Sequence, residues 1–145
     1  MGRDYRKIVA WERSHLLTLA VYQHTKKFPA DERFAMVSQL RRSAYSVPAN
    51  IAEGSARDSK RDYLRFLYIA LGSLKETEYF LLLARALVYL TDEQFENAAE
   101  TVGAAFGALA GLIKAVQREA GFFGRSWALL LSGALLYAAR RSMLP

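Results

Sequence analysis

A cluster of basic side chains lies near the middle of the chain. It consists of Arg57, Lys60, Arg61 and Arg65, with Tyr63 and Tyr68 interleaved or directly following. Cationic groups contact phosphates and aromatic rings stack on bases, so this composition is typical of a surface that binds nucleic acid. The alternative, which these residues alone favour, is a solvated turn whose tyrosines belong to the core. We predict phosphate contacts for these four cations and for the pair Arg41 and Arg42.

A polar stripe precedes the basic cluster. At 100° per residue, one side of a helix over residues 39–57 carries Gln39, Arg42, Ser43, Ser46, Asn50, Glu53 and Arg57. Such side chains at i, i+3 and i+4 spacing form hydrogen-bonded ladders, either as a seam between helices or subunits or as a binding surface. Satisfied polar networks fix helix register, which favours the seam. We assign the seam to Gln39, Ser46, Asn50 and Glu53, with Glu53 pairing with Arg57 or Arg42.

The residues that perform catalysis or bind metals do not converge in this sequence. His15 and His24 are nine positions apart and point to opposite sides of one helix. His15 is expected to pack on an apolar face. The nearest carboxylate pair is Glu76 and Glu78, which are two residues apart and therefore point in different directions on a helix. Glu53 has no second carboxylate with which to form a catalytic pair. Phosphate-binding glycine loops, nucleophile elbows and His-Glu-x-x-His motifs are missing. We predict no enzyme activity, no metal site and no cofactor.

Composition and charge describe one folded domain with a basic first half. The chain has 145 residues, 52% of them hydrophobic, no cysteine and a formal net charge of +6. Thirteen of the 20 basic residues lie in the first 65 positions, against seven of the 14 acidic ones. This asymmetry indicates either an acidic partner or a solvated face. The lack of cysteine fits a reducing compartment, and a signal peptide is not expected, so we predict a cytoplasmic protein.

Helix-favouring residues extend from end to end, and no segment alternates like a strand. We predict four helices, over residues 4–27, 31–54, 60–90 and 91–119. Phe28 and Pro29 end the first, and Pro48 is expected to kink the second because it cannot donate to the carbonyl of Ala44. The pairs Ser59 with Asp62 and Thr91 with Gln94 resemble capping boxes that begin the last two.

Each predicted helix has an apolar side. The first helix is expected to bury Ile8, Trp11, His15, Leu19 and Tyr22. The second buries Leu40, Ala44, Val47 and Ile51. The third carries a heptad seam of Tyr63, Leu67, Ala70, Leu74, Thr77, Leu81, Ala84 and Val88. It also has a second apolar row, which indicates oligomerisation. The fourth buries Phe95, Ala98, Val102, Ala105, Leu109, Leu112 and Val116.

Two features of the last third of the chain leave alternatives open. Gly103, Gly107 and Gly111 form a ridge, which indicates either a close helix crossing or a weak, frayed helix. We divide the chain into a bundle over residues 1–119 and an apolar tail over residues 120–145. Residues 126–139 carry no charge, yet are too few to span a bilayer as a helix. They are an extra packing helix, an interfacial anchor or a partner-binding segment. Packing within the assembly is favoured, and membrane contact is not expected.

The polar stripe and its surroundings resemble a known family. The motifs are Val-Tyr-x-x-Thr-x-x-Phe-Pro-x-x-Glu at 21–32, Gln-Leu-Arg-Arg-Ser-Ala at 39–44, Ser-Val-Pro-Ala-Asn-Ile-Ala-Glu-Gly at 46–54 and Phe-Leu-Tyr-Ile-Ala-x-Gly-Ser-Leu-x-Glu at 66–76. This pattern, over residues 4–117, is similar to that of bacterial four-helix bundle proteins found as reading frames in intervening sequences of 23S ribosomal RNA genes. The family has no settled biochemical function.

The resemblance implies an all-α, up-down-up-down antiparallel four-helix bundle that assembles as a ring-shaped homopentamer. The family is similar in fold to accessory variability proteins of diversity-generating retroelements, which are basic pentamers that bind RNA and a reverse transcriptase. Five copies of a +6 chain attract nucleic acid strongly. We therefore predict a basic oligomer that binds RNA or DNA. The alternative is a scaffolding homo-oligomer that binds a partner protein.

Overall fold

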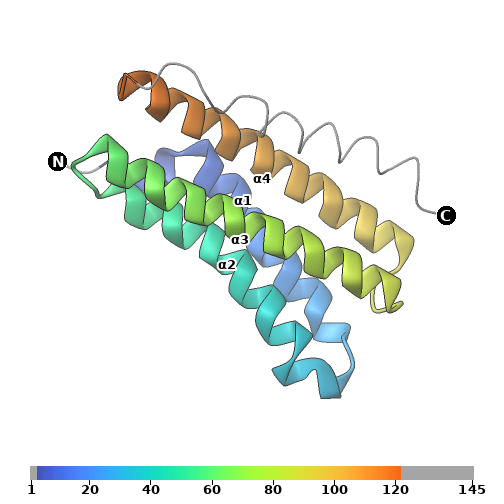
Figure 1. The fold of residues 1–145 in the computed structure, drawn as a ribbon. Coiled ribbons are helices and arrows are strands. Elements are labelled where there is room, and N and C mark those ends of the chain that lie inside the picture. Colours follow the sequence, from blue (N-terminus) through green and yellow to red (C-terminus); the bar gives the residue numbers. More distant parts are fainter. Residues whose placement is uncertain (1–2, 122–145) are drawn as a thin grey trace.

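The computed structural model describes residues 3–121, and the predicted apolar tail lies almost entirely outside them. Four α-helices dominate: α1 (Val9–His24), α2 (Met36–Ser55), α3 (Lys60–Ala86) and α4 (Asp92–Glu119). Short 3₁₀ turns precede α1 (η1, Tyr5–Lys7) and connect α1 to α2 (η2, Thr25–Lys27; η3, Ala30–Phe34). Successive helices run in opposite directions, as Figure 1 shows. Within residues 3–121 the chain is therefore all-α, as predicted.

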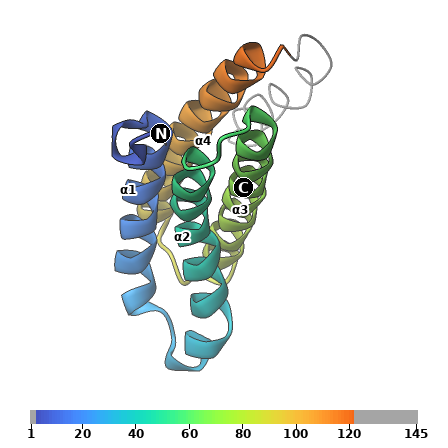
Figure 2. The ribbon, with the colours of Figure 1, turned by 90° about the vertical axis from the view of Figure 1, so that its left-hand side faces the viewer.

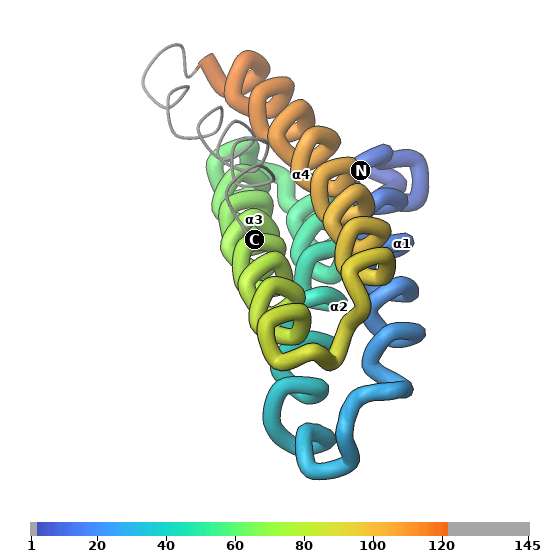
Figure 3. The backbone as a smooth tube through the Cα atoms, turned by 90° about the vertical axis from the view of Figure 1, so that its right-hand side faces the viewer, coloured from blue at the N-terminus to red at the C-terminus, as the bar shows by residue number. Residues whose placement is uncertain are grey.

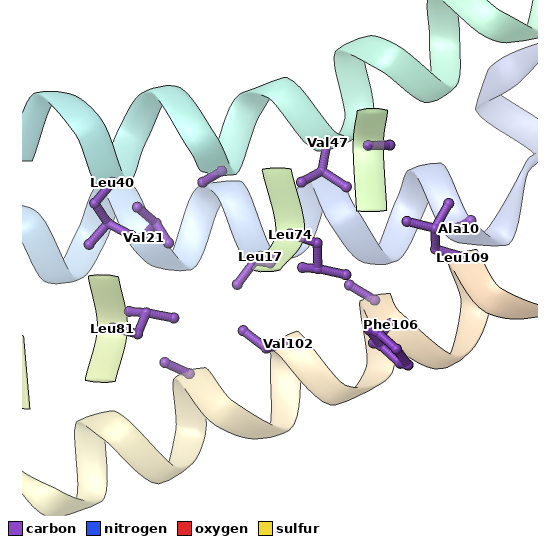
Figure 4. Close-up of a cluster of buried hydrophobic side chains, with 14 of the residues drawn as sticks. Ala10, Leu17, Val21, Leu40, Val47, Leu74, Leu81, Val102, Phe106 and Leu109 are labelled. Carbon is purple, nitrogen blue, oxygen red and sulfur yellow. The ribbon is translucent and has the colours of Figure 1, made fainter. Parts of the chain in front are cut away.

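The helices close into a bundle because α4 returns to α1. Contacts join α1 to α2, α2 to α3, α3 to α4 and α4 to α1 (Figures 2 and 3). The core between them is aliphatic, with Leu17, Leu40, Leu74 and Leu109 at 2% exposure or less (Figure 4). Burial of such side chains provides the main stabilisation of the bundle.

Local hydrogen bonds and backbone conformation determine where the helices begin. The capping box at the start of α4 is confirmed, since Thr91 accepts from the backbone of Gln94 and the Gln94 side chain accepts from the backbone N–H of Thr91. Ser59 caps α3 through the backbone N–H of Asp62. Two predicted starts were too early. α1 begins at Val9, because Ile8 is extended, and α2 begins at Met36, after η3.

The end of α3 also differs from the prediction. The helix stops at Ala86 instead of Leu90, because Val88 adopts the left-handed conformation with φ 61°. The amides of Val88 and Tyr89 then bond back to the carbonyls of Arg85 and Ala84, which satisfies the end of the helix. Val88 is consequently 85% exposed instead of lying in the seam.

The predicted buried face of α1 is wrong for His15, Leu19 and Tyr22, whereas Ile8 and Trp11 are partly buried against the core. The helix buries the side that carries Ala10, Ser14, Leu17, Thr18 and Val21. Leu19 is 49% and Tyr22 39% exposed, and His15 is also exposed. Both sides of this helix are rich in apolar residues, so periodicity alone does not distinguish the side that meets the core. The predicted stripe of α2 is confirmed, since all four of its residues are fully buried.

Candidate nucleic-acid interface

Three parts of the chain meet at one end of the bundle, which we call the basic end (Figure 1). They are the segment before α1, the turn between α2 and α3, and the end of α4. The backbone N–H of Arg3 donates to the carbonyl of Ser55 at 3.2 Å. The Arg3 guanidinium lies 5.0 Å from the centre of the Tyr63 ring and 3.6 Å from the Glu119 carboxylate. The first residues described thus join α2, α3 and α4.

A glycine sets the close approach at the α2–α3 turn. Gly54 lies one residue before the end of α2, and a Cβ there would lie 2.8 Å from the Cβ of Phe66 and 2.9 Å from the Tyr63 ring. Only a residue without a side chain lets α3 fold back this tightly. The turn therefore brings Arg57, which follows α2, and Arg65 of α3 to the same aromatic ring, that of Phe66.

The cations of the basic end are partly paired. Arg57 bonds to Glu53 at 2.5 Å and lies over the Phe66 ring, 4.7 Å from its centre. Lys60 pairs with Glu119, and this hydrogen bond lowers the pKa of the Glu119 carboxyl. Arg61 is exposed and makes no ion pair within residues 3–121. Such exposed guanidinium groups are available to phosphates without breaking an internal contact.

Arg65 completes the part of the predicted site that the structure gathers at this end. Its guanidinium lies 5.5 Å from the centre of the Phe66 ring, which the Arg57 guanidinium also contacts. Tyr68 lies further along α3, where its hydroxyl accepts from the Gln117 amide. Tyr63 is fully buried, and its hydroxyl has no hydrogen-bond partner among the residues described. Tyr63 is therefore a core residue and does not present a stacking face.

Arg41 and Arg42, also predicted to contact phosphates, do not lie at the basic end. Arg41 lies 14 positions before the end of α2, which is about 21 Å along the helix. Its guanidinium donates to the Thr25 hydroxyl at 2.8 Å and covers the Tyr22 ring. Arg42 instead bonds to Glu76 at 2.9 Å. Both side chains connect α2 to neighbouring helices.

Further cations at this end were missed because they are remote in sequence. Arg3, Arg6 and Lys7 precede α1, and Arg118 lies in the last turn of α4. The excess of positive charge in the first half of the chain includes Arg3, Arg6 and Lys7, but it does not indicate where in the fold they lie. Arg6 bonds to Asp4 and lowers the pKa of that carboxyl.

The polar stripe of α2 lies only partly against α3, because Gln39, Asn50 and Glu53 bond within the stripe itself. The hydroxyls of Ser46 and Ser73 are 2.9 Å apart, and the buried hydroxyl of Thr77 donates to that of Ser43 at 3.0 Å. Asn50 donates to the carbonyl and hydroxyl of Ser46, within α2. Gln39 accepts from Arg42, and Glu53 pairs with Arg57. Thr77 was predicted to lie in the heptad seam of α3, but neither Thr77 nor Ser73 was predicted to bond to the polar stripe of α2.

Catalytic chemistry has little support in the described part of the chain. No group of three His, Asp or Glu side chains within residues 3–121 is close enough to bind a metal ion. His15 stacks on Trp11, with the ring centres 5.1 Å apart, but it is exposed, so it does not lie on the buried side of α1 as expected. Burial lowers the pKa of His24, and Lys27 adds to that effect.

The fold and this site define a class: a small antiparallel four-helix bundle with cations gathered at one end. The sequence matches the family described as 23S rRNA-intervening sequence protein over residues 6–109, and the chain belongs to this family. The comparison with curated proteins finds no match.

A solved structure supports the family relationship. It is a protein of unknown function from the S23 ribosomal protein family of Bacteroides thetaiotaomicron VPI-5482. This chain is 31% identical to it, with a TM-score of 0.68 over 73% of this chain and 96% of the other. The family is one of unknown function without a known catalytic activity.

Proposed function

We propose that this chain is a non-enzymatic, cytoplasmic protein that assembles with further copies of itself and binds RNA or DNA through the basic end. The observation that carries the proposal is the convergence of Arg3, Arg6, Lys7, Arg57, Lys60, Arg61, Arg65 and Arg118 at one end of the bundle. Phosphate contacts supply most of non-specific nucleic-acid affinity, and they require no catalytic group. All of these cations except Lys60 are exposed, which suits contact with an extended polyanion.

Self-assembly multiplies this charge. The outward side of α1 exposes apolar residues, with Val9 at 59%, Leu16 at 45% and Leu19 at 49% exposure. Exposed apolar rows of this kind mark interaction surfaces, and a second copy of the chain, in a ring of five, would cover them. Light scattering of the full chain should then give a pentamer, and Leu16→Asp combined with Leu19→Asp should dissociate it without loss of helix. A monomeric wild-type chain would contradict the assembly.

The binding test is an anisotropy titration with labelled structured RNA and duplex DNA between about 50 and 300 mM salt. Affinity should fall steeply with salt. Arg61→Ala with Arg65→Ala should reduce the slope of log K against log salt by about one to two, since each lost phosphate contact removes about 0.7–0.9. The matched control, Lys27→Ala with Arg33→Ala, removes the same charge at the opposite end of the bundle and should have a smaller effect.

Two outcomes would overturn the nucleic-acid proposal. One is a lack of binding at the lowest salt concentration. The other is an equal loss of affinity in the two double variants. A scaffold that binds a protein would then be favoured, and Phe34 and Val88, exposed at 87% and 85% in the connections at the opposite end, would be its candidate contacts. Salt-insensitive capture of one protein, lost in Phe34→Ser, would identify that function.

A further inference from the structure

Three aromatic rings stack on one another where the basic end meets α1. The rings of Tyr5, in η1, and Trp11, in α1, meet edge to face, with their centres 5.1 Å apart and their planes at 61°. The Trp11 ring lies nearly parallel to that of His15, with the centres 5.1 Å apart and the planes at 7°. η1 packs against the start of α1, which brings Tyr5 to the helix (Figure 2). Side chains from two elements therefore form one continuous stack.

The stack is open at its His15 end. Trp11 is partly buried against the core, so it anchors the stack to the bundle, whereas Tyr5 and His15 are exposed. Within residues 3–121, Trp11 is the only aromatic ring that contacts His15. A neutral imidazole carries one hydrogen-bond donor and one acceptor. His15 can therefore receive a further flat ring and bond to polar atoms at the edge of that ring.

Tyr22 continues this side of α1 away from the basic end. At 100° per residue, Trp11, His15 and Tyr22 lie within about 40° of one another around the helix, over about 17 Å of its length. Tyr22 is exposed, and the Arg41 guanidinium of α2 lies over its ring, 4.7 Å from the centre. We call Tyr5, Trp11, His15 and Tyr22 the aromatic row. It leads from the basic end along the side of α1 that borders α2.

Cations accompany the start of the aromatic row. The Arg6 guanidinium lies 5.8 Å from the centre of the Tyr5 ring, and the Arg6 side chain is 72% exposed although it bonds to Asp4. Lys7 follows it in η1 and is exposed. Residues 3–13 carry four basic and two acidic side chains. Aromatic rings interleaved with cations match a ligand that carries both bases and phosphates.

We propose that the aromatic row stacks the unpaired bases of a single-stranded nucleic acid whose phosphates contact the basic end. This inference rests on the proposed function and narrows its ligand to one class. Inside a duplex each base face is covered by the next base, so only an unpaired base adds to the stack at His15. Duplexes contact the basic end through their phosphates alone. Every base has an aromatic face, so binding tolerates many sequences in both RNA and DNA strands.

A second copy of the chain is the other candidate for this surface. Two residues of the proposed assembly surface, Val9 and Leu16, lie about 140–160° around α1 from Trp11, and Leu19 lies about 80° away, between the two sides. Assembly centred on Val9 and Leu16 leaves the aromatic row uncovered. An imidazole buried between two subunits also needs hydrogen-bond partners, whereas an imidazole beside a bound base keeps its edge in water. These two points favour the nucleic acid.

The first experiment separates bases from phosphates. Labelled single strands of about 12 nucleotides, one of uridine RNA and one of thymidine DNA, are titrated with the full-length chain by anisotropy. The comparison ligands are an abasic strand of the same length and a duplex. Either base-containing strand should bind at least about fivefold more tightly than the abasic strand, which is the smallest gain expected from one stacked base. The RNA and DNA arms show whether the sugar contributes.

Variants of the exposed ring locate the stacking site. His15→Ala should weaken binding of the base-containing strand by about fivefold or more and leave binding of the abasic strand unchanged. His15→Phe keeps a ring and should restore the affinity. Tyr79→Ala, which removes an exposed ring from α3, is the matched control and should change neither affinity. Arg61→Ala with Arg65→Ala should instead weaken both strands by the same factor, because it removes phosphate contacts alone.

Trp11 provides a direct signal from within the stack. The chain has two tryptophans, Trp11 and Trp127, so the emission of Trp127→Phe comes from Trp11 alone. A base-containing strand should quench this emission, and an abasic strand should not. Quenching should be smaller in Trp127→Phe with His15→Ala, since the base is then not held beside the stack.

The possible failures of this inference and of the proposed function differ. Equal affinity for base-containing and abasic strands, with binding that still depends on Arg61 and Arg65, would overturn the stacking and leave the proposed function standing. Light scattering of His15→Ala gives another such result: if the variant dissociates and binds both strands as the wild type does, the row is a contact between copies. Failure of every strand to bind at low salt would overturn the proposed function and this inference together.

Discussion

The hydroxyl of Thr18 on α1 lies 3.0 Å from the backbone carbonyl oxygen of Ala44 on α2. Pro48, four residues later, has no N–H with which to satisfy that carbonyl, and α2 continues through it. Thr18 also lies 3.0 Å from the carbonyl of Ser14, so its proton is shared between the two oxygens. A side chain from a neighbouring helix therefore replaces the hydrogen bond that proline removes.

Thr18→Val should lower the free energy of unfolding by about 1–2 kcal/mol, because it leaves the buried Ala44 carbonyl without a donor. Chemical denaturation measures this change. Thr101→Val, which removes a hydroxyl bonded only within its own helix, is the control and should be nearly neutral. In a Pro48→Ala background the restored N–H should reduce the cost of Thr18→Val by at least half. If Thr18→Val lowers the free energy of unfolding equally in the wild-type and Pro48→Ala backgrounds, the Thr18 hydroxyl does not replace the hydrogen bond that proline removes.

Gly54→Ala should destabilise the bundle by about 1–3 kcal/mol, since the new methyl would overlap Phe66 and Tyr63. Gly72→Ala, on α3 with open space around its Cβ, should instead stabilise by up to about 1 kcal/mol through helix propensity. Thermal unfolding of the two variants gives the comparison. If the melting temperature shifts in the same direction in both variants, the close approach of Phe66 and Tyr63 to Gly54 does not determine the effect of Gly54→Ala.

Tyr63→Phe should leave stability unchanged or raise it by up to about 1 kcal/mol, because the hydroxyl is buried without a partner among residues 3–121. Tyr89→Phe provides the contrast. The Tyr89 hydroxyl donates to Glu32 at 3.0 Å, and this bond raises the pKa of Tyr89. Its loss should destabilise the bundle. If Tyr63→Phe is the more harmful of the two, the Tyr63 hydroxyl has a partner beyond residues 3–121.

Val88→Gly should stabilise the protein by about 1 kcal/mol. A β-branched side chain at φ 61° is strained, and glycine adopts this conformation without cost. Little contact is lost, because Val88 is 85% exposed. Urea denaturation of Val88→Gly and of the neighbouring exposed-site variant Leu87→Ala separates relief of strain from loss of apolar surface. If Val88→Gly instead lowers the free energy of unfolding, the Val88 side chain makes a contact outside the single chain.

Stability should fall as the pH drops below about 6.5, in part through His24. Burial, with Lys27, lowers the pKa of His24 in the folded state below its ordinary value. The unfolded chain therefore binds the proton first, and protonation favours unfolding. His24→Gln should flatten the difference in unfolding free energy between pH 7.5 and 5.5. An unchanged difference would remove His24 as a cause.

The candidate interface could be predicted only in part. Arg57, Lys60, Arg61 and Arg65 are close in sequence, and a turn between two helices keeps them close in space. Arg41 and Arg42 are also near in sequence, yet α2 carries them about 21 Å from its end. Arg118 joins the basic end from the far end of the sequence because α4 runs back to it.

By itself, the sequence determined what depends on neighbours three or four residues apart. Helix content, the capping box at Thr91 and the buried stripe of α2 follow from local hydrogen bonds and periodicity. Only the tertiary structure decided which side of α1 meets the core, because both sides are apolar and the choice depends on α2 and α4. It also decided which cations share a surface, since contacts between remote residues bring the start of the chain, the α2–α3 turn and the end of α4 together.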